Sequence, residues 1–284
     1  MMVVTGATGK LGRLVVEALL ETVPAVRIVA AVRSPEKAAD LAARGVQVRR
    51  ADYTRPETLG PALAGAGKLL LVSSSEVGKR AAQHAAVVEA AARAGVGLVA
   101  YTSVLRGEAS PLGLAAEHVA TEALIRKAGL PFVFLRNGWY LENYTENLGP
   151  VLQHGAVLGC AGAGRVAAAS RRDFAEAAAA VLTGKGHAGK IYELCGDVPF
   201  TMAELAAEVG RQAGKPIVYR ELPPEQYRAV LVGAGVPPPF ADLLVDSDLG
   251  IAKGALDAAG GDLRRLIGRP TTTLAAAVTA ALQG

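Results

Sequence analysis

Three glycines near the N-terminus could hold a phosphate group. Gly6, Gly9 and Gly12 follow a short β-branched run at residues 3–5 and precede a stretch typical of a helix. A strand that turns through glycines into a helix presents free backbone N–H groups at the positive end of the helix dipole. Gly6 would permit the turn, Gly9 the approach of phosphates and Gly12 close helix–strand packing. The spacing G-x-x-G-x-x-G therefore predicts a dinucleotide site formed by Gly6, Ala7, Thr8, Gly9, Lys10, Leu11 and Gly12.

The residue after the second predicted strand indicates which dinucleotide binds. Folds of this kind place an acidic residue there to bind the ribose 2′-hydroxyl of NAD, but this chain has Arg33. An arginine can pair with the 2′-phosphate of NADP, with Lys37 as a second positive charge, or can be a solvated surface residue. Asp52 and Tyr53 follow the third predicted strand, where they could meet the adenine ring or form a turn and pack. We expect NADP(H).

Polar and aromatic side chains follow the next three predicted strands. Ligands of open α/β sheets bind beyond the carboxyl ends of the strands. The fourth strand ends in Ser73, Ser74 and Ser75, whose hydroxyls can bond ribose oxygens, and the fifth ends in residues 101–103. The sixth is followed by Asn137, Gly138, Trp139, Tyr140, Leu141, Glu142, Asn143 and Tyr144. These aromatic and amide side chains could form a pocket for a planar substrate or fill the seam between two parts of the protein.

The elements that must position these residues alternate along the first half of the chain. Strand-like runs lie at residues 3–5, 27–32, 46–49, 69–72, 98–101 and 132–135. Most are continuously apolar, as expected for parallel strands covered on both faces. Ser34 before a proline and the capping-box pairs Thr54/Glu57 and Thr201/Glu204 predict three helix starts.

This alternation predicts an α/β protein with a Rossmann-type doubly wound parallel sheet. We expect an NADP-binding domain over residues 1–140. A smaller C-terminal α/β portion, residues 141–284, would close over the cofactor and form the substrate pocket, with the chain free to cross back between the two.

Composition excludes several other classes of protein. No run approaches the ~20 apolar residues of a membrane-spanning helix, and the N-terminus lacks a signal-peptide pattern. The formal charge is only +4 and the basic residues are scattered, so nucleic acid is not expected as a partner. Cys160 and Cys195 have no metal-ligand spacing, so we expect reduced thiols, no metal and a cytoplasmic protein. Whether the chain forms a homo-oligomer is left open.

The same residues resemble the NmrA-like atypical short-chain dehydrogenases and, more closely, the bacterial type 2 NADPH:quinone oxidoreductases. The resemblance runs nearly end to end and rests on residues 5–9, 33, 51–53, 73–78, 101–103, 110–114, 117–118, 135–144, 191–194, 246–248 and 267–273. It implies two-electron reduction of quinones by NADPH without flavin. It also implies cofactor contacts at residues 6–11, 33, 73–75 and 137–142.

The Tyr-x-x-x-Lys pair of ordinary short-chain dehydrogenases is missing. The corresponding helix instead has His118 and Glu122 four residues apart, which could relay a proton or form a structural ion pair. A quinone accepts hydride readily because its product becomes aromatic, so holding it against the nicotinamide could suffice.

We expect Tyr140, Asn143 and Ser103 to form the acceptor pocket, with Ser103 as a hydrogen-bond donor. Arg171 would line the far side of the cofactor site, although Asn143 and Arg171 could equally make a structural hydrogen bond. The competing hypothesis is an NADP(H) redox sensor of the NmrA type, which binds dinucleotide with little turnover.

Overall fold

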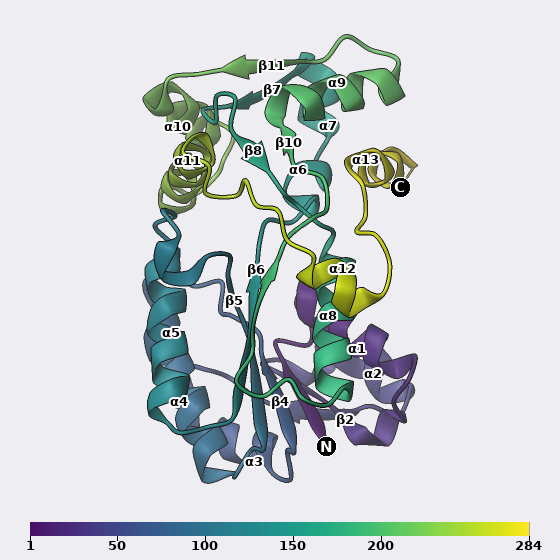
Figure 1. Cartoon of the computed structure of the whole chain (residues 1–284), viewed down its shortest axis with the longest axis vertical. Helices are drawn as coiled ribbons and strands as arrows, with labels where there is room; N and C mark the ends of the chain where they lie inside the picture. The colour runs from purple at the N-terminus through teal and green to yellow at the C-terminus, as the bar shows by residue number, and fades with distance from the viewer. Residues whose placement is uncertain (284) are drawn as a thin grey trace.

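A seven-stranded parallel sheet forms the centre of the larger part of the molecule (Figure 1). The computed structural model describes residues 1–283. The strand order is β3-β2-β1-β4-β5-β6-β9, and neighbouring strands are parallel throughout. The strands are β1 Met2–Thr5, β2 Ile28–Val32, β3 Gln47–Arg50, β4 Lys68–Leu71, β5 Leu98–Val104, β6 Phe132–Asn137 and β9 Ile191–Leu194. The order of the first six confirms the predicted Rossmann-type fold.

Helices cover both faces of this sheet because successive strand residues point to opposite sides. Val4 packs into the core beneath α1 and α8, while Val3 packs into the core beneath α3, α4 and α5. These helices, with the smaller ones around them, are α1 Lys10–Leu20, η1 Ala25–Arg27, η2 Pro35–Ala38, α2 Ala39–Ala43, η3 Pro56–Thr58, α3 Leu59–Leu63, α4 Arg80–Arg93, η4 Gly107–Ala109, α5 Ala115–Lys127, α8 Arg171–Thr183 and α12 Asp262–Ile267.

A smaller α/β portion lies beyond the carboxyl ends of the strands, at the top of Figure 1. Two short sheets, β10-β8 and β11-β7, support it around a separate apolar core. Its elements are α6 Glu142–Thr145, α7 Gly149–His154, β7 Ala156–Gly159, β8 Arg165–Val166, β10 Phe200–Thr201, α9 Met202–Ala213, β11 Val218–Glu221, α10 Pro224–Gly233, α11 Pro238–Ala252 and α13 Leu274–Gln283. The chain first leaves the large sheet at Asn137, the last residue of β6. The chain returns to the sheet with α8 and β9 before it completes the smaller portion.

One predicted capping box is present and one is wrong. The Thr201 hydroxyl accepts a bond from the Glu204 N–H and the Glu204 carboxylate accepts one from the Thr201 N–H, as the sequence predicts. Thr54 instead donates its N–H and hydroxyl to the Asp52 carboxylate, at 2.9 and 2.7 Å. Because Asp52 captures both groups in a turn, the following helix begins without Thr54 as its cap. Ser34 likewise makes no side-chain cap.

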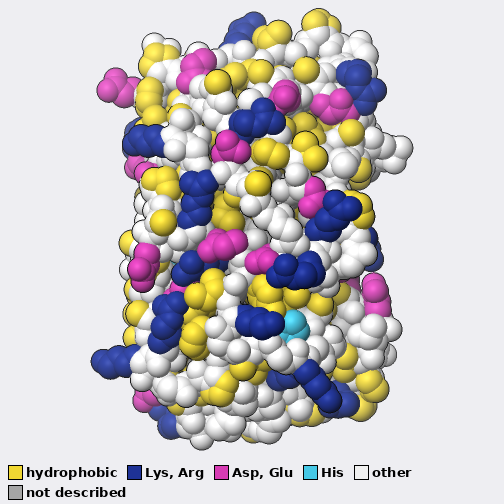
Figure 2. Space-filling model, in the orientation of Figure 1, with side chains coloured by type: hydrophobic (Ala, Val, Ile, Leu, Met, Phe, Trp, Pro, Cys, Tyr) yellow, Lys and Arg dark blue, Asp and Glu magenta, His cyan; other side chains and the backbone are white. Residues whose placement is uncertain are grey.

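Charge on the molecular surface is mixed. On the face that Figure 2 shows, Lys and Arg side chains lie among Asp and Glu rather than in a basic stripe. None of the helices described is long and apolar enough to cross a membrane.

Candidate active site

The glycine turn has the shape of a phosphate cradle. Gly6 has φ +58°, and its carbonyl accepts a bond from the Gly9 N–H at 2.8 Å. A Cβ on Gly12 would lie 2.3 Å from the Gly6 oxygen, so only glycine allows α1 to approach the turn this closely. The first bond within α1 runs from Arg13 N–H to the Gly9 carbonyl at 3.0 Å. The N–H groups of the first turn, beginning at Lys10, are therefore left for a ligand.

Arg33 lies at the carboxyl end of β2, where the sequence places it. Its side chain is 72% exposed, and its nearest carboxylate is that of Glu76, 3.8 Å away. Burial tends to raise the pKa of the nearby Asp52 carboxyl. The hydrogen bonds that Thr54 donates to this carboxylate and the charge of Arg33 outweigh burial, so the pKa of Asp52 is lowered. Among residues 1–283 this loose pair with Glu76 is the one ion pair of Arg33, so its guanidinium is available for a bidentate contact with a phosphate.

Tyr53 is held mainly by its hydroxyl. This group lies 2.6 Å from Thr5 Oγ1 and 2.9 Å from the Val72 carbonyl, to which it can donate. The Thr5 hydroxyl in turn donates to the Leu70 carbonyl at 3.0 Å. The hydroxyl of Tyr53 therefore ties β1 to β4, and only the ring remains for the predicted adenine contact.

Residues 137–142 run along the junction of the two portions. The buried Asn137 Oδ1 has no hydrogen-bond partner among residues 1–283. Gly138 donates its N–H to the Leu194 carbonyl at 2.7 Å, and a Cβ on Gly138 would lie 3.1 Å from that oxygen. Glu142 accepts the Arg171 N–H at 2.9 and 3.0 Å, so its carboxylate holds the start of α8. The Asn137 Oδ1 is therefore left for a ligand.

Arg171 brings together the residues expected at the acceptor pocket. Its guanidinium lies 5.0 Å from the centre of the Tyr140 ring and donates to Asn143 Oδ1 at 3.2 Å. It also pairs with Glu146, which pairs with Lys10 on α1. The structural Asn143–Arg171 bond is therefore present, and it ties α6 to α8. Glu146 is absent from the predicted set, although its place one helical turn after Glu142 is a signal that could have revealed it.

The sequence predicts that Ser103 donates a hydrogen bond to a substrate, but its hydroxyl already has an acceptor within the protein. Its buried hydroxyl donates to Glu122 Oε1 at 2.7 Å. Glu122 also accepts bonds from Arg136 at 2.9 and 2.8 Å. Ser103 points toward α5 on the same strand face as Tyr101, and its proton serves this buried ion-pair network.

His118 and Glu122 form neither the ion pair nor the relay pair that their spacing allows, because each side chain has another partner. His118 Nδ1 bonds the Tyr101 hydroxyl at 2.8 Å, whereas Glu122 pairs with Arg136. Burial, reinforced by the charge of Arg80, lowers the pKa of His118 to about 3. The imidazole is therefore neutral at physiological pH, and a neutral ring forms no salt bridge.

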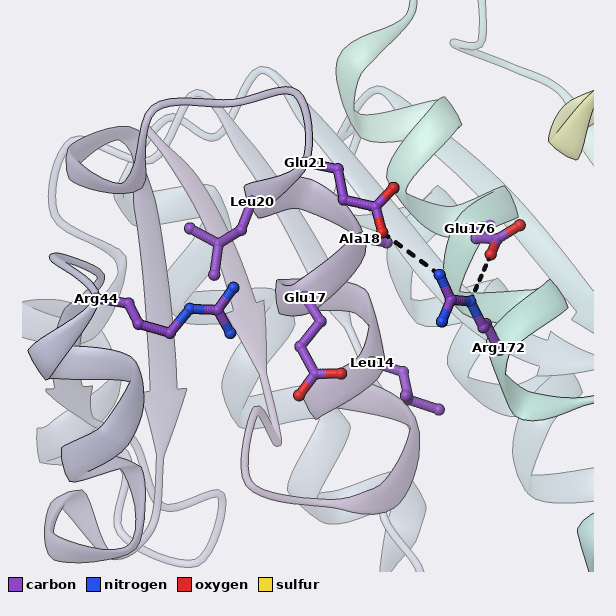
Figure 3. A pocket seen from close by; sticks show the side chains of 8 residues that line it. All are labelled: Leu14, Glu17, Ala18, Leu20, Glu21, Arg44, Arg172 and Glu176. Atoms are coloured by element: carbon purple, nitrogen blue, oxygen red, sulfur yellow. Dashed lines mark hydrogen bonds and ion pairs between the residues drawn. The ribbon is translucent and has the colours of Figure 1, made fainter. Parts of the chain in front are cut away.

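A hollow of about 320 Å³ lies apart from the strand ends, between the outer sides of α1 and α8 (Figure 3). It is lined by Leu14, Glu17, Ala18, Leu20, Glu21, Arg44, Arg172 and Glu176. Arg172 pairs with Glu21 at 3.5 Å and with Glu176 at 2.9 Å. Because Arg172 is already paired with both carboxylates and no aromatic side chain lines the hollow, we place the candidate site at the strand ends.

Comparisons with known proteins identify the family of this chain. The NmrA-like family matches residues 1–247. Quinone oxidoreductase 2 of Escherichia coli (strain K12) is 50% identical over 279 residues, which are 98% of each chain. The structure of the E. coli enzyme complexed with NADPH matches with a TM-score of 0.97 and covers 99% of this chain and 100% of its own. Triphenylmethane reductase of Citrobacter sp., complexed with NADP(H), matches with a TM-score of 0.96 at 42% identity, over 99% of this chain and 100% of its own. With most of its length matched, this chain is a member of the NmrA-like family.

Proposed function

We propose that this protein is an NADPH-dependent oxidoreductase that reduces quinones by direct two-electron hydride transfer, without flavin. The glycine cradle at Gly6–Gly12 and the exposed Arg33 support a dinucleotide that carries a 2′-phosphate. The 50% identity to a quinone oxidoreductase and the fold match to its NADPH complex support the same cofactor and acceptor class.

Different residues of the chain would contact different parts of NADPH. The N–H groups at the start of α1 would hold the pyrophosphate, and Arg33 the 2′-phosphate. Residues 73–75 would contact ribose oxygens, and the unpartnered Asn137 Oδ1 would accept a bond from the nicotinamide end. When bound, NADPH supplies the hydride.

The single observation that carries the proposal is that the helix normally bearing the catalytic acid offers none. On α5, His118 is buried and neutral, and Glu122 is bonded to Arg136 and Ser103. An unactivated ketone needs an acid at this point, because hydride addition leaves an alkoxide. A quinone does not, since its reduced form is stabilised by aromaticity and water can supply the proton. The chain therefore needs only to hold the acceptor in place.

Tyr140 and Arg171 are the side chains we assign to this holding role. Tyr140 lies edge-on to Phe174, with ring centres 5.3 Å apart, and under the Arg171 guanidinium. A ring fixed on two sides presents a preorganised flat surface to a planar acceptor. Asn143 would orient the acceptor through its amide, although its oxygen already accepts a bond from Arg171.

Steady-state oxidation of NADPH and NADH across a panel of quinones and aldehydes tests the proposal. We expect quinone-dependent oxidation that prefers NADPH, with no reaction on simple aldehydes. Tight NADPH binding without turnover on any quinone would instead identify a redox sensor. We also infer a cytoplasmic protein, in keeping with two free, buried cysteines.

A further inference from the structure

The loop that follows β4 is held by buried side chains that the proposed function does not use. Residues 73–78 connect β4 to α4 at the carboxyl edge of the sheet. This loop carries the three serines that we assign to the cofactor, so the inference below rests on the proposed function. Its backbone conformation decides where those hydroxyls point.

His84 fixes the peptide group of Ser74. The imidazole is fully buried, on α4, and its Nε2 accepts the Ser74 N–H at 2.9 Å. Its Nδ1 lies 2.9 Å from Thr121 Oγ1, and the Thr121 hydroxyl donates to the Glu117 carbonyl at 2.9 Å. A backbone N–H can only donate, and the Thr121 proton is already used. The ring proton must therefore sit on Nδ1, with Nε2 free to accept.

Two further bonds hold the same loop from the same side. Arg80 Nε donates to the Ser74 carbonyl at 2.8 Å, so that both Ser74 backbone groups are paired with α4. The Gly78 N–H donates to Glu117 Oε1 on α5 at 3.1 Å, and Arg80 lies 3.5 Å from the other Glu117 oxygen. The loop is therefore bonded to α4 near its start, through Ser74, and to α5 near its end, through Gly78.

We propose that His84 is a positioning residue for the dinucleotide, which holds Ser74 so that the hydroxyls of residues 73–75 face the ribose. An imidazole suits this position because it accepts from the loop and donates to α5 across one rigid ring. Burial, helped by the charge of Arg80, lowers the pKa of His84 to about 3, so the acceptor nitrogen persists at physiological pH. His84 itself touches no ligand.

The test compares two amides at position 84. Glutamine can place an acceptor near the position of Nε2, whereas asparagine reaches only as far as Nδ1. Loss of one neutral hydrogen bond predicts that His84→Asn raises the Kd of NADPH and NADH alike, by about tenfold, and that His84→Gln stays within about threefold of wild type. The KM for NADPH should follow its Kd, with kcat at saturating NADPH within about twofold of wild type. The control variant is His187→Leu. His187 precedes β9 and its Nδ1 lies 2.8 Å from the Tyr192 hydroxyl, so this change removes another hydrogen-bonded histidine and should leave both Kd values unchanged.

Direct titration of nucleotide binding distinguishes a failure of the proposed function from a failure of the proposed role of His84. Wild-type protein that binds neither nucleotide refutes the proposed function. Wild-type binding with equal Kd values for the two amide variants overturns the inference about His84. The nitrogen NMR shifts of the wild-type imidazole provide a test that needs no variant: we expect a proton on Nδ1, and a proton on Nε2 would also overturn the inference.

Discussion

Replacing Arg33 with alanine should separate the two nicotinamide dinucleotides. The side chain is 72% exposed and lies 3.8 Å from Glu76, so it is solvated and only loosely paired. A charge-assisted hydrogen bond contributes about 1.5–3 kcal/mol, and exposure places this one near the lower end. At about 1.4 kcal/mol per tenfold change in affinity, the Kd of NADPH should rise roughly 10- to 30-fold. NADH lacks the 2′-phosphate, so its Kd should stay within about twofold of the wild-type value.

The assay is a titration of each nucleotide by isothermal calorimetry at low and high salt. Arg33→Lys keeps the charge but loses the fork of donors, so it should fall between wild type and alanine. Glu76→Gln removes the carboxylate that faces Arg33, and we expect it to tighten NADPH about two- to threefold at low salt only. Equal weakening of NADPH and NADH by Arg33→Ala would refute the assignment of Arg33 to the 2′-phosphate.

Three other perturbations follow from the same structure. Gly12→Ala should destabilise the protein by about 1–3 kcal/mol and weaken both nucleotides, because its Cβ would meet the turn at 2.3 Å; Gly60→Ala, where a Cβ meets nothing within 4 Å, is the matched control in urea unfolding. Glu122→Gln should cost about 3 kcal/mol, since it removes a buried charge and leaves the partly buried Arg136 guanidinium with one charged partner fewer, and a loss below about 1 kcal/mol would contradict this. The pKa values of His84 and His118 are lowered to about 3 in the folded protein, against about 6.5 in the unfolded chain. Because the unfolded chain binds these protons first, the free energy of unfolding should be highest above about pH 6.5 and should fall as pH falls toward 3. NMR should find both rings neutral at about pH 5, and charged rings would refute the assignment.

Local chemistry in the sequence predicts the geometry of the glycine turn and the place of Arg33 at the end of β2. The requirement for glycine is local at both Gly6 and Gly12. Gly6 turns the chain with a positive φ, and at Gly12 any Cβ would clash with the turn. Arg33 is found by counting from the glycines to the end of the next strand. The strand order then follows from the alternation of elements and the handedness of their crossovers.

Partners that depend on tertiary contacts could not be read from the sequence. Ser103 has the right type for a substrate donor, but its proton goes to Glu122, which approaches from α5 nineteen residues later in the chain. His118 and Glu122 have the spacing of a helical ion pair. In the folded protein, however, His118 bonds Tyr101 and Glu122 bonds Arg136. His84 is one histidine in an alanine-rich helix, and only the packing of the β4–α4 loop reveals its acceptor role.

Direct hydride transfer to a quinone can be followed with an isotopically labelled cofactor. Protein whose spectrum shows no flavin is mixed anaerobically with a quinone and NADPH that carries deuterium at the reactive C4 position. We expect one hydroquinone per NADPH oxidised and a slower rate with the deuterated cofactor, without added flavin. Tight NADPH binding with no quinone reduction above the protein-free rate, or turnover only after flavin is added, would contradict direct hydride transfer.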